Sequence, residues 1–173
     1  MHRDTSMKAL VWEAPERMVV RTPPVPDLAP DEVLIRVARA GICGSELSGY
    51  LGHNALRVPP LIMGHEFAGT LVGMGASAHA LNPDLENGQP VTVNPMVYCG
   101  VCSFCKRGLN HLCVNRTLIG AHRPGAFAEL IAVPARQVTV LPEVVPMTTG
   151  ALTEPVACAV RTGGWAGDVA NQP

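Results

Sequence analysis

The chain has 173 residues, of which 47% are hydrophobic and 16% are charged, with a formal net charge of −1. This length suits one domain, at most with an appendage, and the apolar content excludes general disorder. The near-neutral charge gives no reason to expect nucleic acid or an anionic membrane surface as a partner, and no apolar run approaches the roughly 18 residues of a transmembrane helix. The first six residues lack the apolar stretch of a secretory signal, so we expect a cytoplasmic location.

Short strands joined by many turns are the expected secondary structure, because 17 glycines and 16 prolines interrupt the chain. This pattern predicts a mainly β fold of the barrel or sandwich type. The first two strands should form a hairpin, followed by a proline-rich link over residues 22–30. The expected strands are residues 7–12, 17–21, 32–40, 67–72, 90–93, 126–133 and 137–141.

Two segments have helical character. Residues 45–50 can form a short helix with Ser45 as its N-cap, and residues 150–160 are small and apolar with Pro155 in a position that a first helical turn tolerates. Residues 73–78 formally satisfy the G-x-G-x-x-A dinucleotide pattern after a strand, but residues 79–90 carry turn signals instead of an amphipathic helix. We therefore expect a hairpin turn there.

Four of the six cysteines are clustered with the spacing C-x2-C-x2-C-x7-C. Four thiolates in a short loop suit a closed tetrahedral zinc site of the structural kind. An iron–sulfur cluster is the nearest alternative, but the ferredoxin run continues with x3-C-P, which this chain lacks. Buried or disulfide-paired cysteines are a further alternative. We predict a structural zinc lobe over residues 95–115, with ligands Cys99, Cys102, Cys105 and Cys113.

A second group of potential metal ligands is scattered along the chain. Cys43 follows a strand, His65 and Glu66 precede one, and Glu154 lies at a probable helix start. Catalytic zinc sites use about three ligands of this mixed type and keep one position open. Each residue also has an ordinary structural explanation, since lone cysteines are often core residues and a glutamate favours a helix N-terminus.

The order and spacing of four motifs resemble the catalytic domain of zinc-dependent medium-chain alcohol and polyol dehydrogenases. These motifs are Gly41-Ile42-Cys43-Gly44-Ser45, Gly64-His65-Glu66, the cysteine lobe and Glu154-Pro155. The resemblance implies a GroES-like twisted β-barrel with short helices, a remote structural zinc in the lobe, and a catalytic zinc near Cys43 and His65. It also implies that Glu66 ligates or orients this metal.

Other residue roles follow from the same resemblance. Glu154 lies where polyol, threonine and secondary-alcohol members carry a carboxylate, which indicates a polyol or secondary alcohol as the small-molecule substrate. Ser45 resembles the hydroxyl that takes the proton from the bound alcohol. Ser48 stands where the family often has a proton-relaying histidine, and His53 is a possible substitute. Cys158 lies one helical turn after Glu154 and could approach the zinc if that turn is helical, but a buried core thiol is the simpler explanation.

Domain boundaries follow from this comparison of motifs. Residues 1–6 are expected to be an extension, residues 7–161 the GroES-like domain, and residues 162–173 a truncated linker toward a nucleotide-binding Rossmann domain that this chain lacks. NAD or NADP would bind that domain in the full-length enzyme, which we expect to be a homo-oligomer. The chain alone is therefore expected to bind zinc without dehydrogenase turnover.

Two alternatives belong to other functional classes. A stand-alone zinc-binding structural or interaction module would need the lobe but not the scattered residues. A thiol-based redox switch would need free thiols in the lobe, which zinc would occupy. Metal content distinguishes these readings, because the enzyme-derived domain should hold two zinc ions per chain, the module one and the redox switch none.

Overall fold

The computed structural model describes residues 5–166, and for residues 164–166 the backbone alone. Residues 1–4 of the predicted extension lie outside this range, while Thr5 and Ser6 pair with the proline-rich link: Val25 N–H donates to the Thr5 carbonyl at 3.1 Å. The predicted linker begins inside a helix that runs to Ala166, and its residues 167–173 lie outside the described range.

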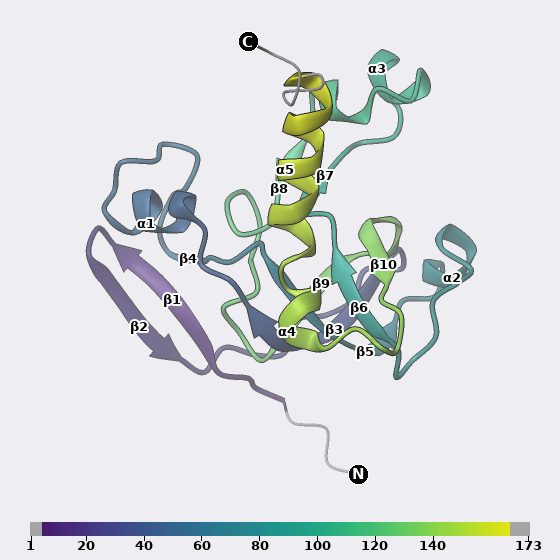
Figure 1. Cartoon of the computed structure of the whole chain (residues 1–173). Coiled ribbons are helices and arrows are strands. Elements are labelled where there is room, and N and C mark those ends of the chain that lie inside the picture. The colour runs from purple at the N-terminus through teal and green to yellow at the C-terminus, as the bar shows by residue number, and fades with distance from the viewer. Residues whose placement is uncertain (1–4, 167–173) are drawn as a thin grey trace.

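Three antiparallel sheets form the body of the described chain (Figure 1). The first sheet has the order β2-β1-β4, the second β10-β6-β5-β3-β9, and the third pairs β7 with β8. The predicted hairpin of β1 and β2 is confirmed, with Val11 opposite Val19. The strands are β1 Ala9–Ala14, β2 Arg17–Arg21, β3 Glu32–Ala40, β4 Leu61–Ile62, β5 Phe67–Met74, β6 Pro90–Val93, β7 Met96–Val97, β8 Thr117–Leu118, β9 Leu130–Pro134 and β10 Val138–Val140.

The two larger sheets are joined through the segment that precedes β9. Leu10 N–H donates to the Phe127 carbonyl at 2.8 Å, and Glu129 N–H donates to the Lys8 carbonyl at 3.0 Å. The predicted strand over residues 126–133 is wrong in its first half, because β9 begins at Leu130 and Ala128 pairs with Ala9 of β1. Glu129 is shared, since its N–H donates to the Lys8 carbonyl and its carbonyl accepts from Val37 N–H of β3 at 3.0 Å. One apolar run therefore serves two sheets, which curves the structure around its core.

The helices are short except for the last. Helix α1 begins one residue earlier than expected, with Cys43 and not Ser45 as its N-cap. The predicted hairpin after β5 is confirmed in its strand pairing, because β6 returns antiparallel to β5, but residues 75–89 form a longer connection that contains α2 instead of a tight turn. The helices are α1 Gly44–Tyr50, α2 Ala78–Leu81, α3 Ser103–Lys106, α4 Met147–Gly150 and α5 Thr153–Ala166, with 3₁₀ turns η1 Asn110–Leu112 and η2 Ala135–Gln137.

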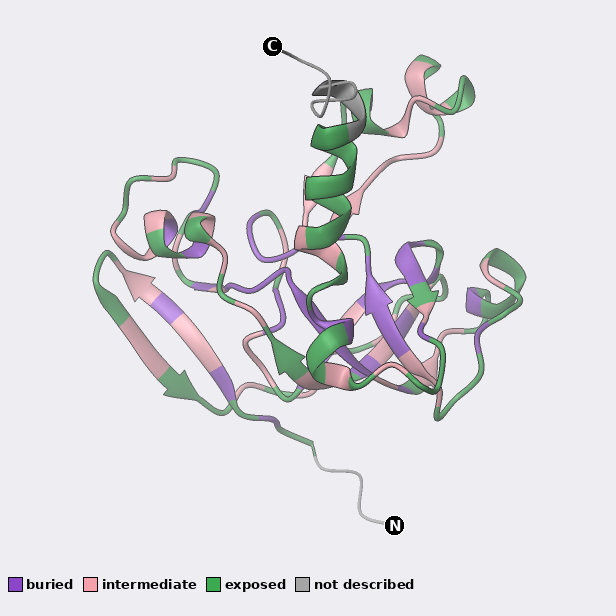
Figure 2. Cartoon of the chain, viewed as in Figure 1, coloured by how far each residue is buried: buried purple, intermediate pink, exposed green. Residues whose placement is uncertain are grey.

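The main hydrophobic core lies against the five-stranded sheet, where Figure 2 shows the buried residues. On β3, Val33 and Ile35 are both fully buried, in agreement with the alternation in the sequence. They pack with Leu71 of β5 and Val91 of β6. Among residues 5–166, no helix combines the length and the apolar character needed to cross a membrane.

Candidate metal centres

The pairing of β3 with β5 brings the scattered ligands together. These strands are antiparallel with Ala40 opposite Phe67, so the residues that follow β3 lie beside those that precede β5. Gly41 N–H donates to the Glu66 carbonyl at 2.7 Å and extends this ladder. Cys43 and His65 therefore reach the same edge of the sheet.

Side-chain ligand atoms at this edge form two overlapping groups that share His65. Cys43, Glu46 and His65 make one group, and His65, Glu66 and Glu154 make the other. Within each group the ligand atoms lie within 4.8 Å of one another. Each residue of the predicted catalytic zinc set thus lies in one of these two groups, and His65 links Cys43 to the pair Glu66 and Glu154. The structure adds Glu46, which the sequence analysis missed.

Glu154 reaches the centre because α4 packs on the sheet. Ala151, which follows α4, is buried against Ala68 of β5 and Leu141. Gly150 permits this close approach, since a Cβ there would lie 3.1 Å from the Ala68 Cβ. Helix α5 starts two residues after Ala151, with Glu154 in its first turn.

Glu46 is the most buried carboxylate of the centre, with 2% of its surface exposed. One carboxylate oxygen, Oε1, lies 2.6 Å from His65 Nδ1 and accepts a bond from Arg57 Nη2 at 3.0 Å. The other oxygen accepts a bond from the Cys43 N–H at 3.0 Å. When Nδ1 carries the proton of a neutral imidazole, the Nε2 lone pair is left for a metal ion.

The same contacts set the electrostatics of this pair. Burial raises the pKa of Glu46, but the hydrogen bond and charge of His65 together with the charge of Arg57 outweigh burial and lower it. Burial lowers the pKa of His65, but Glu46 outweighs it and raises the pKa. The pair therefore favours an ionised carboxylate beside the imidazole in the metal-free chain.

A local signal for Glu46 was present in the sequence. Glutamate at the third position of a helix commonly bonds back to the N-cap N–H, and Glu46 occupies this position after Cys43. With Ser45 as the expected N-cap, Glu46 would be the first residue of the helix instead of the third, so this pattern was not recognised. No local signal marked Arg57, because its partners lie 11 and 63 residues away along the chain.

Two glycines leave room for close contacts beside the centre: Gly41 for the Glu66 carboxylate, and Gly64 for the turn that leads into β5. A Cβ at Gly41 would collide with the Glu66 carboxylate. Gly64 has φ +98°, a region that favours glycine, and a Cβ there would lie 2.6 Å from the Phe127 ring. Phe127 N–H donates to the Met63 carbonyl at 2.9 Å, so this segment holds the turn that precedes His65.

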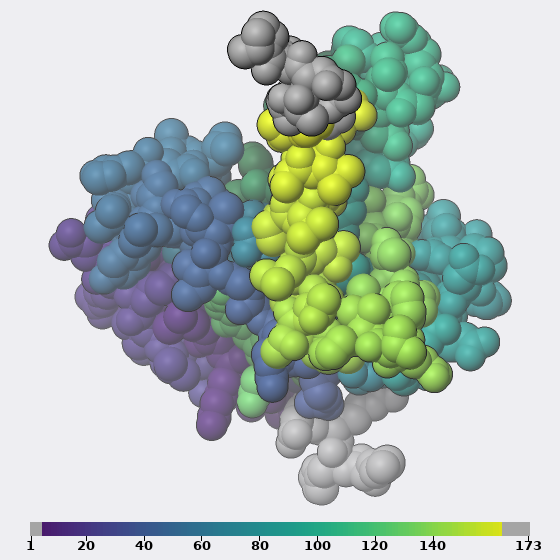
Figure 3. Space-filling view, viewed as in Figure 1, coloured from purple at the N-terminus to yellow at the C-terminus, as the bar shows by residue number. Residues whose placement is uncertain are grey.

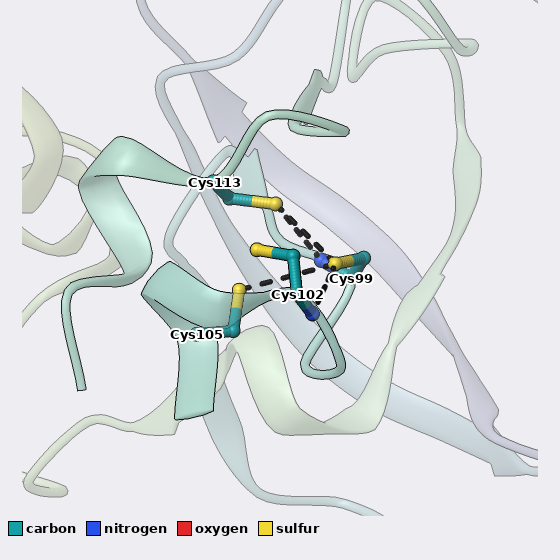
Figure 4. A group of neighbouring side chains, drawn as sticks. All are labelled: Cys99, Cys102, Cys105 and Cys113. Carbon is teal, nitrogen blue, oxygen red and sulfur yellow. Dashed lines mark hydrogen bonds between the residues drawn. The ribbon is translucent and has the colours of Figure 1, made fainter. Parts of the chain in front are cut away.

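The cysteine lobe forms a separate centre, in which four sulfur atoms converge (Figure 4). Its sulfur–sulfur distances include 3.6 Å between Cys113 and Cys99 and 4.0 Å between Cys99 and Cys105. Tetrahedral coordination with zinc–sulfur bonds of about 2.3 Å requires sulfur atoms about 3.8 Å apart. The four thiols are free and match this geometry.

The thiols of the lobe differ in acidity when no metal ion neutralises them. The backbone N–H of Cys105 is the main cause that lowers the pKa of Cys102 to about 6. Burial, followed by the hydrogen bond with Cys102, raises the pKa of Cys105 to about 12. Four adjacent thiolates repel one another, and a divalent cation removes this repulsion.

The remaining predicted residues lie around the first centre. Ser45 is half-buried, and its Oγ accepts a bond from Arg57 Nη2 at 3.2 Å. His53 is exposed, and its N–H donates to the Ser48 carbonyl at 2.9 Å. The expected core role of Cys158 is wrong, because it is exposed on α5 and its thiol donates to Glu154 Oε1 at 3.2 Å.

Several known proteins with related sequences or structures are dehydrogenases. The chain is 39% identical over 160 residues to L-threonine 3-dehydrogenase of Chelativorans sp. strain BNC1, covering 90% of this chain and 45% of that protein. Galactitol-1-phosphate dehydrogenase of Escherichia coli superposes with a TM-score of 0.85 at 31% identity, over 92% of this chain and 45% of that one. An NADP-bound structure described as a zinc-binding dehydrogenase from Sinorhizobium meliloti 1021 superposes with a TM-score of 0.81 at 35% identity, over 91% of this chain and 44% of that one.

The chain spans about 45% of the length of the curated relatives that it matches. The sequence pattern of the alcohol dehydrogenase GroES-like domain matches residues 29–143, which include β3 to β10, the cysteine lobe and the edge where Cys43, His65 and Glu66 meet. With the mainly β fold and the convergent ligands, this match identifies the chain as a member of the alcohol dehydrogenase GroES-like domain family, of the zinc-type medium-chain dehydrogenases.

Proposed function

We propose that the chain is the zinc-binding catalytic half of an NAD(P)-dependent dehydrogenase that oxidises a polyol or another secondary alcohol. The observation that carries the proposal is the convergence of Cys43, His65, Glu66 and Glu154 at the sheet edge, apart from the cysteine lobe. A stand-alone structural module would need only the lobe. The donor set of sulfur, imidazole nitrogen and carboxylate oxygen is the mixture that catalytic zinc sites use.

The chain's own residues divide the work in this proposal. Cys43 and His65 would hold the metal ion together with Glu66 or Glu154, while Glu46 orients the His65 ring through Nδ1. Bound zinc would supply a Lewis acid that lowers the pKa of an alcohol hydroxyl. The Ser45 hydroxyl would accept the alcohol proton and release its own proton to His53 or water, which carries it toward solvent.

The substrate class rests on Glu154 and on the relatives. L-threonine and galactitol-1-phosphate, named for two of the related enzymes, both carry secondary alcohols. NAD or NADP is proposed as the hydride acceptor, in line with the NADP-bound relative. All pairings between the named strands within residues 5–166 are antiparallel, so this part of the chain contains no doubly wound parallel sheet for a nucleotide. We therefore expect no turnover from the chain alone, and homo-oligomerisation of the full-length enzyme stays a prediction.

Metal analysis of the purified chain tests the proposal. We expect two zinc ions per chain, one in each centre, and no oxidation of sorbitol or L-threonine with either nicotinamide cofactor. One zinc ion per chain, held by the lobe, would favour the structural module instead. Robust turnover by the 173-residue chain would contradict the proposed division of the enzyme into two parts.

A further inference from the structure

Arg57 is a buried cation within the group of residues just described, yet it belongs to none of the motifs. Its side chain is 1% exposed. It comes from the loop between α1 and β4, where its neighbours Leu56 and Val58 are exposed. A fully buried guanidinium between exposed apolar residues is costly unless its donors are satisfied, so its partners define its role.

Three segments meet at this guanidinium. Arg57 Nη2 donates to Glu46 Oε1 at 3.0 Å and to Ser45 Oγ at 3.2 Å, so one nitrogen bonds to two consecutive side chains of α1. Arg57 Nε donates to the Gly120 carbonyl at 3.2 Å. Gly120 in turn packs against Gly64, which precedes His65, since a Cβ at Gly120 would lie 2.8 Å from the Gly64 carbonyl oxygen.

From these contacts we infer that Arg57 is a positioning residue that holds the proposed proton acceptor and the proposed metal ligand in one arrangement. This inference rests on the proposed function. Through Glu46, Arg57 sets the orientation of the His65 ring, because Glu46 Oε1 bonds to both. Through its second bond it occupies one lone pair of Ser45 Oγ, which leaves the other to accept the alcohol proton and the serine proton to be passed on.

The helix itself is shaped for this side chain. Gly49 lies one turn after Ser45, and a Cβ at Gly49 would lie 2.6 Å from Arg57 Cδ and 3.3 Å from Met63 Sδ. The Gly49→Ala change therefore displaces the arginine stem without removing any polar group. Lysine at position 57 would keep the charge but lose the planar fork that reaches three acceptors.

Cobalt binding to the chain with zinc already in the lobe tests the inference. Residues that orient a metal ligand typically contribute about 10- to 100-fold to metal affinity. We expect Arg57→Met to weaken cobalt binding at the second centre by about this factor and to change the visible spectrum of the bound ion. Arg57→Lys and Gly49→Ala should change the cobalt affinity and the spectrum in the same direction but by smaller amounts. These two variants also test the inference if Arg57→Met does not fold.

The matched control is Arg123, which pairs with Glu32 and donates to the Ala132 carbonyl at 2.9 Å, within the sheet. Arg123→Met should lower the melting temperature and leave cobalt affinity and spectrum unchanged. Wild-type affinity and spectrum in all three variants at Arg57 and Gly49, or an equal loss in Arg123→Met, would overturn the positioning role while the proposed function stands. A wild-type chain that binds no second ion would overturn the proposed metal centre and this inference together.

Discussion

Acidic side chains outnumber basic ones at the candidate catalytic centre. Glu46 faces His65 from one group, and Glu66 and Glu154 face it from the other. Neighbouring carboxylates in a partly buried place repel one another, so they favour a nearby cation. Arg57 supplies one positive charge at Glu46, and a divalent ion bound beside Glu66 would supply the rest.

Replacing single cysteines should separate the two centres. Cys43→Ala removes a proposed ligand at the sheet edge and should leave one zinc ion per chain with little change in the melting temperature. Cys105→Ala should empty the lobe and unfold it, because metal binding in such a lobe is itself folding free energy. Elemental analysis and circular dichroism measure both effects. If Cys43→Ala unfolds the chain as fully as Cys105→Ala, the division of roles is wrong.

The Glu46 and His65 pair should make stability depend on pH when the first centre lacks metal. The lowered pKa of Glu46 contributes stability above its ordinary value of 4.5, and this is lost as pH falls through the folded-state pKa. The raised pKa of His65 contributes stability below its ordinary value of 6.5, and this is lost as pH rises through the folded-state pKa. Both contributions are fully present between these ordinary values.

The Cys43→Ala chain, which keeps zinc only in the lobe, provides the background for this measurement. We compare its melting temperature with that of the Cys43→Ala/Glu46→Gln chain, which should be lower. The difference between the two melting temperatures should be largest between about pH 4.5 and pH 6.5. The difference should narrow on both sides of this window. A difference that keeps growing above pH 8 would contradict the assigned directions.

At the level of elements, the lobe and α5 project from the body of the fold while the site stays on the sheet edge. The lobe is attached through β7 and β8, which have two residues each. Gln137 also connects the lobe to the body by two hydrogen bonds. Its backbone carbonyl accepts from Asn94 N–H at 2.9 Å, and its side chain donates to the Met96 carbonyl. Helix α5 rises above the sheets (Figure 3), and Val156 and Val160 are exposed on it.

Metal removal should therefore unfold the lobe locally. A chelator strong enough to strip the four cysteines should increase amide hydrogen exchange within the lobe, residues 95–115, because the strands β7 and β8 that join it to the body have only two residues each. Amides of β3 and β5 in the main sheet should keep their protection. Loss of protection across the whole sheet would instead mean that the lobe and body unfold as one unit.

For the whole molecule, the main hydrophobic core lies against the five-stranded sheet. The site depends on this sheet through the β3 and β5 register and through the packing of Ala151 on Ala68. Leu71 is fully buried in the core on β5, five residues after Glu66. Leu71→Ala should cost about 2–5 kcal/mol of unfolding free energy by leaving a cavity. For a chain of this size that corresponds to about 2–4 °C of melting temperature per kcal/mol.

Zinc content should remain unchanged in Leu71→Ala below its melting temperature, because the β3 and β5 register does not depend on this side chain. Calorimetry and elemental analysis of the same sample check both statements. A folded Leu71→Ala chain with a single zinc ion would show that core packing also sets the ligand geometry.

The sequence by itself determined the local features of this protein. Alternating apolar residues at Val33, Ile35 and Val37 predicted β3, while short strand-like runs with turn residues between them predicted β6 and the β1 and β2 hairpin. These signals are local, so the sequence carries them without the fold. The cysteine spacing predicted a compact ligand group, since a loop of this length must bring its own thiols together. Family motifs indicated Cys43, His65, Glu66 and Glu154 as one set.

Only the tertiary structure decided which residues complete and support the site. Glu46 and Arg57 matter because the α1 helix, the loop before β4 and the turn at Gly120 meet beside His65. These contacts join positions 11 to 63 residues apart, and no periodicity or spacing encodes them. The split of residues 126–133 between two sheets has the same origin, since hydrogen-bond partners of a strand are chosen by the fold and not by the strand's own residues.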